Sequence, residues 1–184
     1  MKKIEYVKTD YKNRFNRQLW LEDRRRDLIH YFDSRNINNG RLSKIPYWCV
    51  VPRTSIWQVP SLGTPGFDGW FGIAGDHPTD VVPLNYFNGE PRVILNHFVN
   101  KWLRAAERLK AGEDYGDFRI EHISERPTIG ELIEDRALRL QRWVDAEDLW
   151  HNVVPMHPII NPEIDESNAV DDSDLEQTKN PPIE

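Results

Sequence analysis

The spacing of apolar residues predicts three main helices, with a region of short strands between the first and the second. The first helix is expected over about residues 11–32, because apolar residues recur every three or four positions there. Thr9 or Asp10 is expected to cap its free N–H groups. Its predicted apolar face comprises Tyr11, Phe15, Leu19, Leu28, Ile29 and Phe32. Residues 33–44, rich in Asn, read as a loop.

The second and third helices have clearer boundary signals. The second is expected to begin near Pro91 and to end before Gly112, since Pro suits the first helical position and Gly the residue after the last. The third is expected to begin at Thr128, because Thr128 and Glu131 have the spacing of a capping box. The predicted core positions are Ile94, Phe98, Trp102, Ala105 and Leu109 on the second helix, and Ile129, Ile133, Ala137, Leu140 and Val144 on the third.

β-branched and aromatic residues dominate three short runs, 47–51, 54–59 and 70–74, with prolines at their borders. The Gly-rich stretch 61–69 is expected to connect two of these strands as a hairpin. Short connections permit only antiparallel pairing. The predicted fold class is therefore α+β, with a small antiparallel sheet of about three to four strands in residues 46–82 packed against three main helices.

The charge of the chain is unevenly distributed. The net charge of −6 combines a basic segment, residues 1–53 with 13 Lys and Arg against 6 Asp and Glu, and an acidic segment, residues 163–184 with 1 against 8. The acidic segment has few aromatic residues, so we expect residues 161–184 to form a disordered tail after a single domain over residues 1–160. We expect a cytoplasmic protein, because no secretory signal or membrane span is visible.

Polar functional groups crowd into one segment, Gly75-Asp76-His77-Pro78-Thr79-Asp80, directly after a predicted strand. We interpret it as a self-bonded turn, in which Gly75 takes a positive φ and the Asp side chains bond backbone N–H groups. A partner-binding role is one alternative. A metal or acid–base site using Asp76, His77 and Asp80 is another, although no second ligand cluster stands at an obvious spacing.

Two further groups are candidate binding residues. Arg24, Arg25 and Arg26 form the most basic run, but consecutive helical residues point about 100° apart and acidic residues flank them, so an ion-paired face is the preferred interpretation. Trp48, Trp57 and Trp70 are expected in the core, and any exposed subset would mark an interface. The single Cys49 permits no internal disulfide, and no cofactor or metal is predicted.

Trp70 followed by Gly75-Asp76-His77-Pro78-Thr79-Asp80 resembles the signature of a family of small bacterial proteins described as a domain of unknown function. The resemblance extends over roughly residues 46–150, through the Ser55-Ile56-Trp57 strand, the aromatic helix 93–109 and the segment Asp148-Leu149-Trp150. It implies an α+β fold. It brings no catalytic residue to this chain.

Three functions are compatible with these patterns. The favoured hypothesis is a non-enzymatic bacterial or phage module that binds a protein partner, as an immunity or antitoxin-like protein does, because charge is segregated into patches and no coherent catalytic set appears. The alternatives are a metal-assisted hydrolase using the Asp76-His77-Asp80 segment, and a nucleic-acid binder using the basic N-terminal region.

Overall fold

The computed structural model describes residues 9–62, 65–116, 118 and 122–150. Its elements in chain order are α1 (Arg14–Ser34), β1 (Trp48–Val50), β2 (Thr54–Pro60), β3 (Gly69–Gly75), β4 (His77–Pro83), η1 (Leu84–Tyr86), α2 (Pro91–Lys110), η2 (Ile123–Glu125), α3 (Arg126–Asp145) and η3 (Glu147–Leu149). This order and composition confirm the predicted α+β class.

The four strands form one antiparallel meander in the order β1-β2-β3-β4. Each strand pairs with the next along the chain, so β1 and β4 are the two edges. The longest ladder joins β2 to β3, with Thr54 opposite Gly75 and Pro60 opposite Gly69. The β3–β4 ladder shifts register between Ile73 and Gly75, which places a bulge in the first part of β4.

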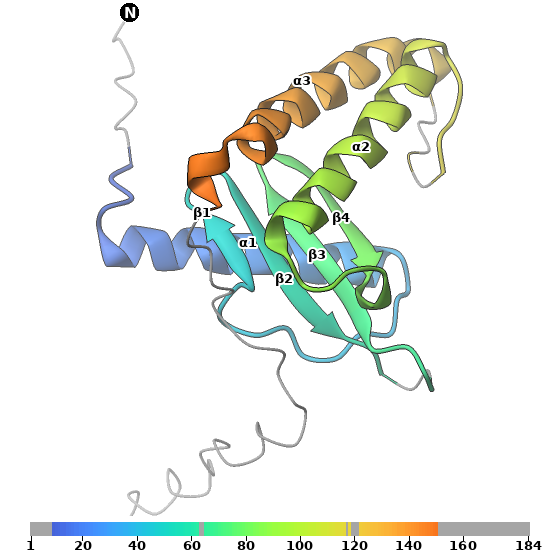
Figure 1. Ribbon diagram of the computed structural model, residues 1–184. Helices are drawn as coiled ribbons and strands as arrows, with labels where there is room; N and C mark the ends of the chain where they lie inside the picture. The colour runs from blue at the N-terminus through green and yellow to red at the C-terminus, as the bar shows by residue number, and fades with distance from the viewer. Residues whose placement is uncertain (1–8, 63–64, 117, 119–121, 151–184) are drawn as a thin grey trace, which may run out of the picture.

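Helices cover both faces of the sheet. One face carries α1, and the other carries the α2–α3 pair (Figure 1). Alternation along the strands supplies both cores, because successive side chains of a strand point to opposite faces. Ile56, Phe71 and Ile73 face α2 and α3, while Trp57 and Ala74 face α1.

Two glycines set how closely the layers pack. A Cβ on Gly72 would lie 2.6 Å from Leu28 Cδ2 of α1, so the absent side chain admits the helix onto β3. A Cβ on Gly130 would lie 2.9 Å from both Ala106 O and Lys110 N of α2. The backbones of α2 and α3 therefore approach each other at Gly130.

The helix predictions are confirmed in existence and corrected at several ends. The first helix begins at Arg14, where Asn13 rather than Thr9 or Asp10 accepts the capping hydrogen bond, from Phe15 N. The second runs from Pro91 as predicted and is followed by Gly112 with φ +81°. The third begins at Arg126, so the predicted capping box at Thr128 is wrong; that residue lies inside the first turn.

The predicted apolar face of the first helix is wrong at its N-terminal end. Leu28 and Phe32 are completely buried, but Phe15 is 67% exposed and Leu19 45%. The reason is helix geometry. At about 100° per residue, Leu19 points about 180° and Phe15 about 140° away from Leu28, which faces the sheet. Figure 1 also shows the first turns of α1 extending past the sheet edge.

The acidic segment predicted to be a disordered tail lies outside the described residues. The last of these, Trp150, stacks on Trp48 of β1 with ring centroids 5.2 Å apart and donates from Nε1 to Trp143 O. No described helix is long and apolar enough to cross a membrane.

Candidate functional site

The segment Gly75–Asp80 forms a hairpin tip and the start of an edge strand. Gly75 ends β3, Asp76 makes the turn and His77 begins β4, so only the start of the segment is the predicted turn and the rest is a strand. Gly75 is not among the described glycines with a positive φ, so the expected positive φ at this position is wrong. It is needed because a Cβ there would lie 2.2 Å from Arg53 O.

Asp76 lies on the surface. Its Oδ2 accepts from Arg53 NH1 at 2.9 Å, and both side chains are more than half exposed. Its backbone N–H donates to Arg53 O, which ties the tip of the β3–β4 hairpin to the β1–β2 connection. An exposed pair of this kind stabilises a fold by less than about 1 kcal/mol.

Asp80 is buried, with 3% of its surface exposed. Its Oδ1 accepts from Lys101 Nζ at 2.8 Å, from Tyr31 OH at 3.2 Å and from Val81 N at 2.8 Å. Its Oδ2 accepts from Trp102 Nε1 at 3.1 Å. Because Tyr31 belongs to α1 and the other two side chains to α2, one carboxylate on the edge strand joins helices from opposite faces of the sheet. We call this arrangement the Asp80 clamp.

His77 is buried against the ring of Trp102, with centroids 5.0 Å apart. Its Nδ1 lies 3.1 Å from Pro78 O and its Nε2 lies 2.8 Å from Thr54 Oγ1. A carbonyl oxygen only accepts, so Nδ1 carries the proton and Nε2 accepts from the Thr54 hydroxyl. Burial lowers the pKa of His77 to about 4, against smaller raising effects from the Pro78 carbonyl and Asp76.

The predicted candidates therefore do not converge on one reaction centre. Asp76 points to Arg53, Asp80 to the two helices, and His77 to Thr54 and Trp102. Pro78 contributes its carbonyl, and Thr79 is half-buried in β4. In the part of the chain that the structure describes, no group of three or more His, Cys, Asp or Glu is placed to hold a metal ion. What this arrangement does is hold α1, the sheet and α2 together.

The three consecutive arginines of α1 diverge. Arg24 pairs with Asp27 at 2.9 Å and lies over the Trp20 ring, Arg25 donates to Leu42 O, and Arg26 pairs with Asp23 at 3.2 Å. Each side chain thus has a local contact. Nucleic-acid binding by this region stays a prediction.

The candidate interface tryptophans are placed mainly in the core. Trp48 is 7% exposed and Trp57 1%, whereas Trp70 is half-buried between Phe32 and Phe67. Cys49 is half-buried, and burial raises the pKa of its thiol. A raised thiol pKa disfavours the reactive thiolate.

A surface feature that the sequence reasoning missed lies on α1. Five residues spaced alternately by four and three positions lie along one side of the helix, and we call them the outer stripe. They are Phe15, Leu19, Glu22, Arg26 and Ile29. The first four are exposed, and Ile29 is half-buried because it packs against the core cluster that contains Leu28 and Phe32. The same four-residue spacing of Phe15 and Leu19 that suggested a core face is the signal that marks this stripe.

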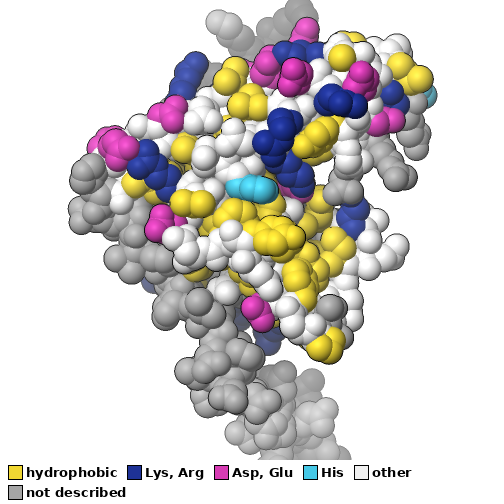
Figure 2. All heavy atoms as spheres, turned by 45° about the vertical axis from the view of Figure 1, so that its right-hand side comes forward, with side chains coloured by type: hydrophobic (Ala, Val, Ile, Leu, Met, Phe, Trp, Pro, Cys, Tyr) yellow, Lys and Arg dark blue, Asp and Glu magenta, His cyan; other side chains and the backbone are white. Residues whose placement is uncertain are grey.

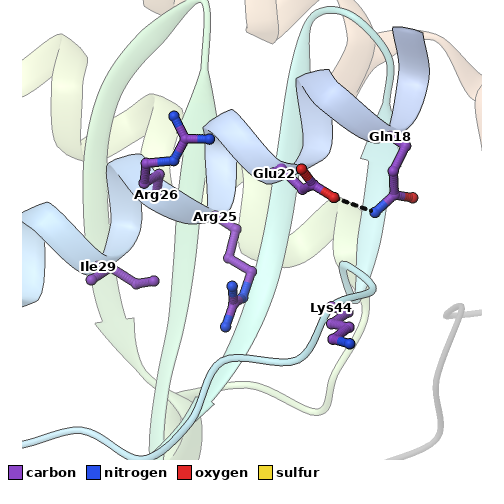
Figure 3. Close-up of a pocket in the computed structure, with 6 residues that line it drawn as sticks. All are labelled: Gln18, Glu22, Arg25, Arg26, Ile29 and Lys44. Atoms are coloured by element: carbon purple, nitrogen blue, oxygen red, sulfur yellow. Dashed lines mark hydrogen bonds between the residues drawn. The ribbon is translucent and has the colours of Figure 1, made fainter. Parts of the chain in front are cut away.

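A shallow groove of about 330 Å³ borders the stripe, between α1 and the segment that leads to β1. Its lining residues are Gln18, Glu22, Arg25, Arg26, Ile29 and Lys44 (Figure 3). Gln18 Nε2 donates to Glu22 Oε1 at 3.1 Å along its wall. The groove combines three cationic side chains with one carboxylate and the half-buried Ile29.

Figure 2 turns the molecule so that the side with α2 and the edge strand β4 comes forward. Figure 2 shows charged side chains over the upper part and the left edge of this view, and hydrophobic ones gathered mainly below the centre. The exposed apolar residues of α3, Leu132 and Leu138, stand six positions apart and so point about 120° from each other. They do not form a continuous stripe as Phe15 and Leu19 do.

Comparison with known proteins gives one match. No curated protein and no solved structure matches the chain. A family model matches residues 14–150, from the first residue of α1 to the Trp150 that stacks on β1. The match covers the signature segment and, beyond the expected resemblance over 46–150, the whole of α1. The chain belongs to the family described as Domain of unknown function (DUF4826).

Proposed function

We propose that this protein acts by binding another polypeptide through the outer stripe of α1. The observation that supports the proposal is the exposure of Phe15 (67%) and Leu19 (45%) one turn apart on a helix whose opposite face is in the core. Single exposed apolar residues are ordinary on a protein surface, but adjacent ones on a helix are typical of a contact surface.

The surroundings of this apolar pair favour a helical or extended peptide as the ligand. Amphipathic helices bind through apolar anchors spaced i, i+4, which is the spacing of Phe15 and Leu19. Charged residues of both signs follow along the stripe and would fix the register of the partner. The adjoining groove gives room for partner side chains.

A crosslinking experiment tests this proposal. A photoreactive residue is placed at position 19 in the full chain and, as a matched control, at position 138, since Leu19 and Leu138 are 45% and 47% exposed. We expect discrete protein adducts in cells only from position 19. Adding Phe15→Asp is expected to abolish them, because a carboxylate replaces one apolar anchor.

Identical adducts from positions 19 and 138 would contradict the proposal, because the stripe would then have no preferred contact. Adducts from position 19 that persist unchanged with Phe15→Asp would contradict it as well. Circular dichroism of the Phe15→Asp variant checks that the helix remains folded; we expect it to, since the replaced side chain is exposed.

A further inference from the structure

The outer stripe is self-complementary. In an antiparallel pair of identical helices, residue i of one faces residue j of the other with i and j adding to a constant. If the twofold axis passes beside Arg24, Glu22 faces Arg26 of the second copy and Leu19 faces its Ile29, each contact occurring twice. The charged pair and the Leu19–Ile29 pair thus match in the same register, while Phe15 lies at the end of the seam.

We propose that the partner of the outer stripe is a second copy of this chain, bound as an antiparallel α1–α1′ pair. This inference rests on the proposed binding role of the stripe and specifies its partner. The 4-3-4-3 spacing from Phe15 to Ile29 is that of a seam between two supercoiled helices. Few other pairings of the five residues match opposite charges and apolar groups at once.

Within a single chain, the two charged residues of the seam make only local surface contacts. Glu22 accepts from Gln18 on its own helix, and Arg26 pairs with Asp23 at 3.2 Å, where both side chains are more than half exposed. Such surface contacts exchange readily for others because each is worth little. Arg14–Ser34 carries five arginines against four acidic residues, so two copies of α1 have almost no net repulsion.

The groove beside the seam also favours the α1 helix of a second copy as the partner. Glu22, Arg26 and Ile29 belong to both the stripe and the groove lining (Figure 3). A helix laid along the stripe would direct side chains into this hollow, as a knob enters a hole in a coiled coil. At either end, Phe15 would reach the last turn of the partner helix, near Asp33.

Charge reversal at two positions tests the pairing. The Glu22→Arg variant has arginine at positions 22 and 26. The Arg26→Glu variant has glutamate at positions 22 and 26. In each variant alone, the two central contacts of the dimer become repulsive. In an equimolar mixture, arginine of one variant faces glutamate of the other at both contacts, so a heterodimer regains them.

Sedimentation velocity of the full chain provides the readout. We expect the wild type to sediment as a dimer of the 21.7 kDa chain at micromolar concentration. Each single variant is expected to raise the dimer dissociation constant roughly tenfold or more, since two contacts change sign. The mixture is expected to recover most of the wild-type affinity. Arg139→Glu is the matched control, as an exposed arginine in an i,i+4 pair with Asp135 on α3, and should leave the dimer unchanged.

Three results would overturn the homodimer. These are a wild-type monomer at all concentrations, single variants that dimerise as the wild type does, or a mixture as weak as its components. Effects confined within one helix cannot produce rescue by mixing, so a folding defect is not mistaken for support. A monomeric wild type that still crosslinks to a different protein from position 19 would reject the second copy and retain the proposed binding role.

Discussion

The Asp80 carboxylate is almost completely buried and accepts four hydrogen bonds, so its substitution affects several buried partners at once. Removing it leaves Lys101, Tyr31 and Trp102 without their common acceptor. Loss of one partner from a buried charged network costs more than an exposed ion pair contributes, because the remaining groups stay desolvated.

Asp80→Ala is therefore expected to lower the free energy of unfolding by about 3 kcal/mol, measured by urea denaturation. The neighbouring Asp76→Ala is the control, since it removes only an exposed pair with Arg53 and should cost less than about 1 kcal/mol. Equal losses from the two variants would mean that Asp80 contributes no more than a surface residue.

His77 gives the fold a specific pH dependence. Its pKa is about 4 when folded and near 6.5 when unfolded, so between these values the unfolded chain binds more protons. The contribution of neutral His77 is complete above about pH 6.5 and is lost as the pH falls toward 4, by about 3 kcal/mol in total.

Denaturation of wild type and His77→Gln at several pH values measures this effect. The stability difference between the two proteins should shrink as the pH falls from 6.5 to 4, because the substitution removes the titrating group. The carboxylates of the chain titrate in both proteins, so their contributions cancel in the difference between the two free energies of unfolding. A difference that stays constant across this window would show that His77 keeps its ordinary pKa.

At the scale of elements, Gly130 decides how α2 and α3 pack. Alanine normally favours a helix over glycine by about 1 kcal/mol. Here its Cβ would lie 2.9 Å from backbone atoms of α2, which cannot rotate away. Overpacking costs about 1–3 kcal/mol, so steric repulsion outweighs the helix preference.

Gly130→Ala should accordingly lower the unfolding temperature rather than raise it. Glu131→Ala, at the next and exposed position, controls for a general effect of alanine and should change stability by less than about 0.5 kcal/mol. A more stable Gly130→Ala protein, measured by thermal unfolding, would show that the α2–α3 pair relaxes at little cost.

The elements differ in how far local sequence determines them. α2 follows its apolar stripe, Pro91 and Gly112 closely, because all three signals are local. The polar residues His77, Thr79 and Asp80 predict a turn rather than the fourth strand, because their burial depends on α1 and α2 and not on local sequence. Helical spacing alone separates Phe15 and Leu19 from Leu28 and Phe32, but it does not say which of the two sides meets the sheet.

The Asp80 clamp acts at the scale of the whole molecule. It connects α1 and α2, two helices that are separated in the chain by all four strands. Tyr31 and Lys101 reach the same carboxylate oxygen from helices on opposite faces of the sheet. We therefore expect Asp80→Asn to increase amide hydrogen exchange in α1 and α2 together. Thr54→Val, which removes the partner of His77 but none of the clamp, is the comparison. Faster exchange confined to β4 in Asp80→Asn would show that the helices are held by apolar packing alone.

Both open edges of the sheet are poorly suited to accept another strand. β1 has three residues and stands between Pro46 and Pro52, while β4 contains Pro78 and Pro83 and begins with a bulge. Proline has no N–H to offer, and an irregular edge cannot template a continuous ladder. The architecture thus resists the backbone-to-backbone stacking that leads to fibrils. The recognition that we propose uses helix side chains instead, whose pattern can discriminate between partners in a way that backbone peptide groups cannot.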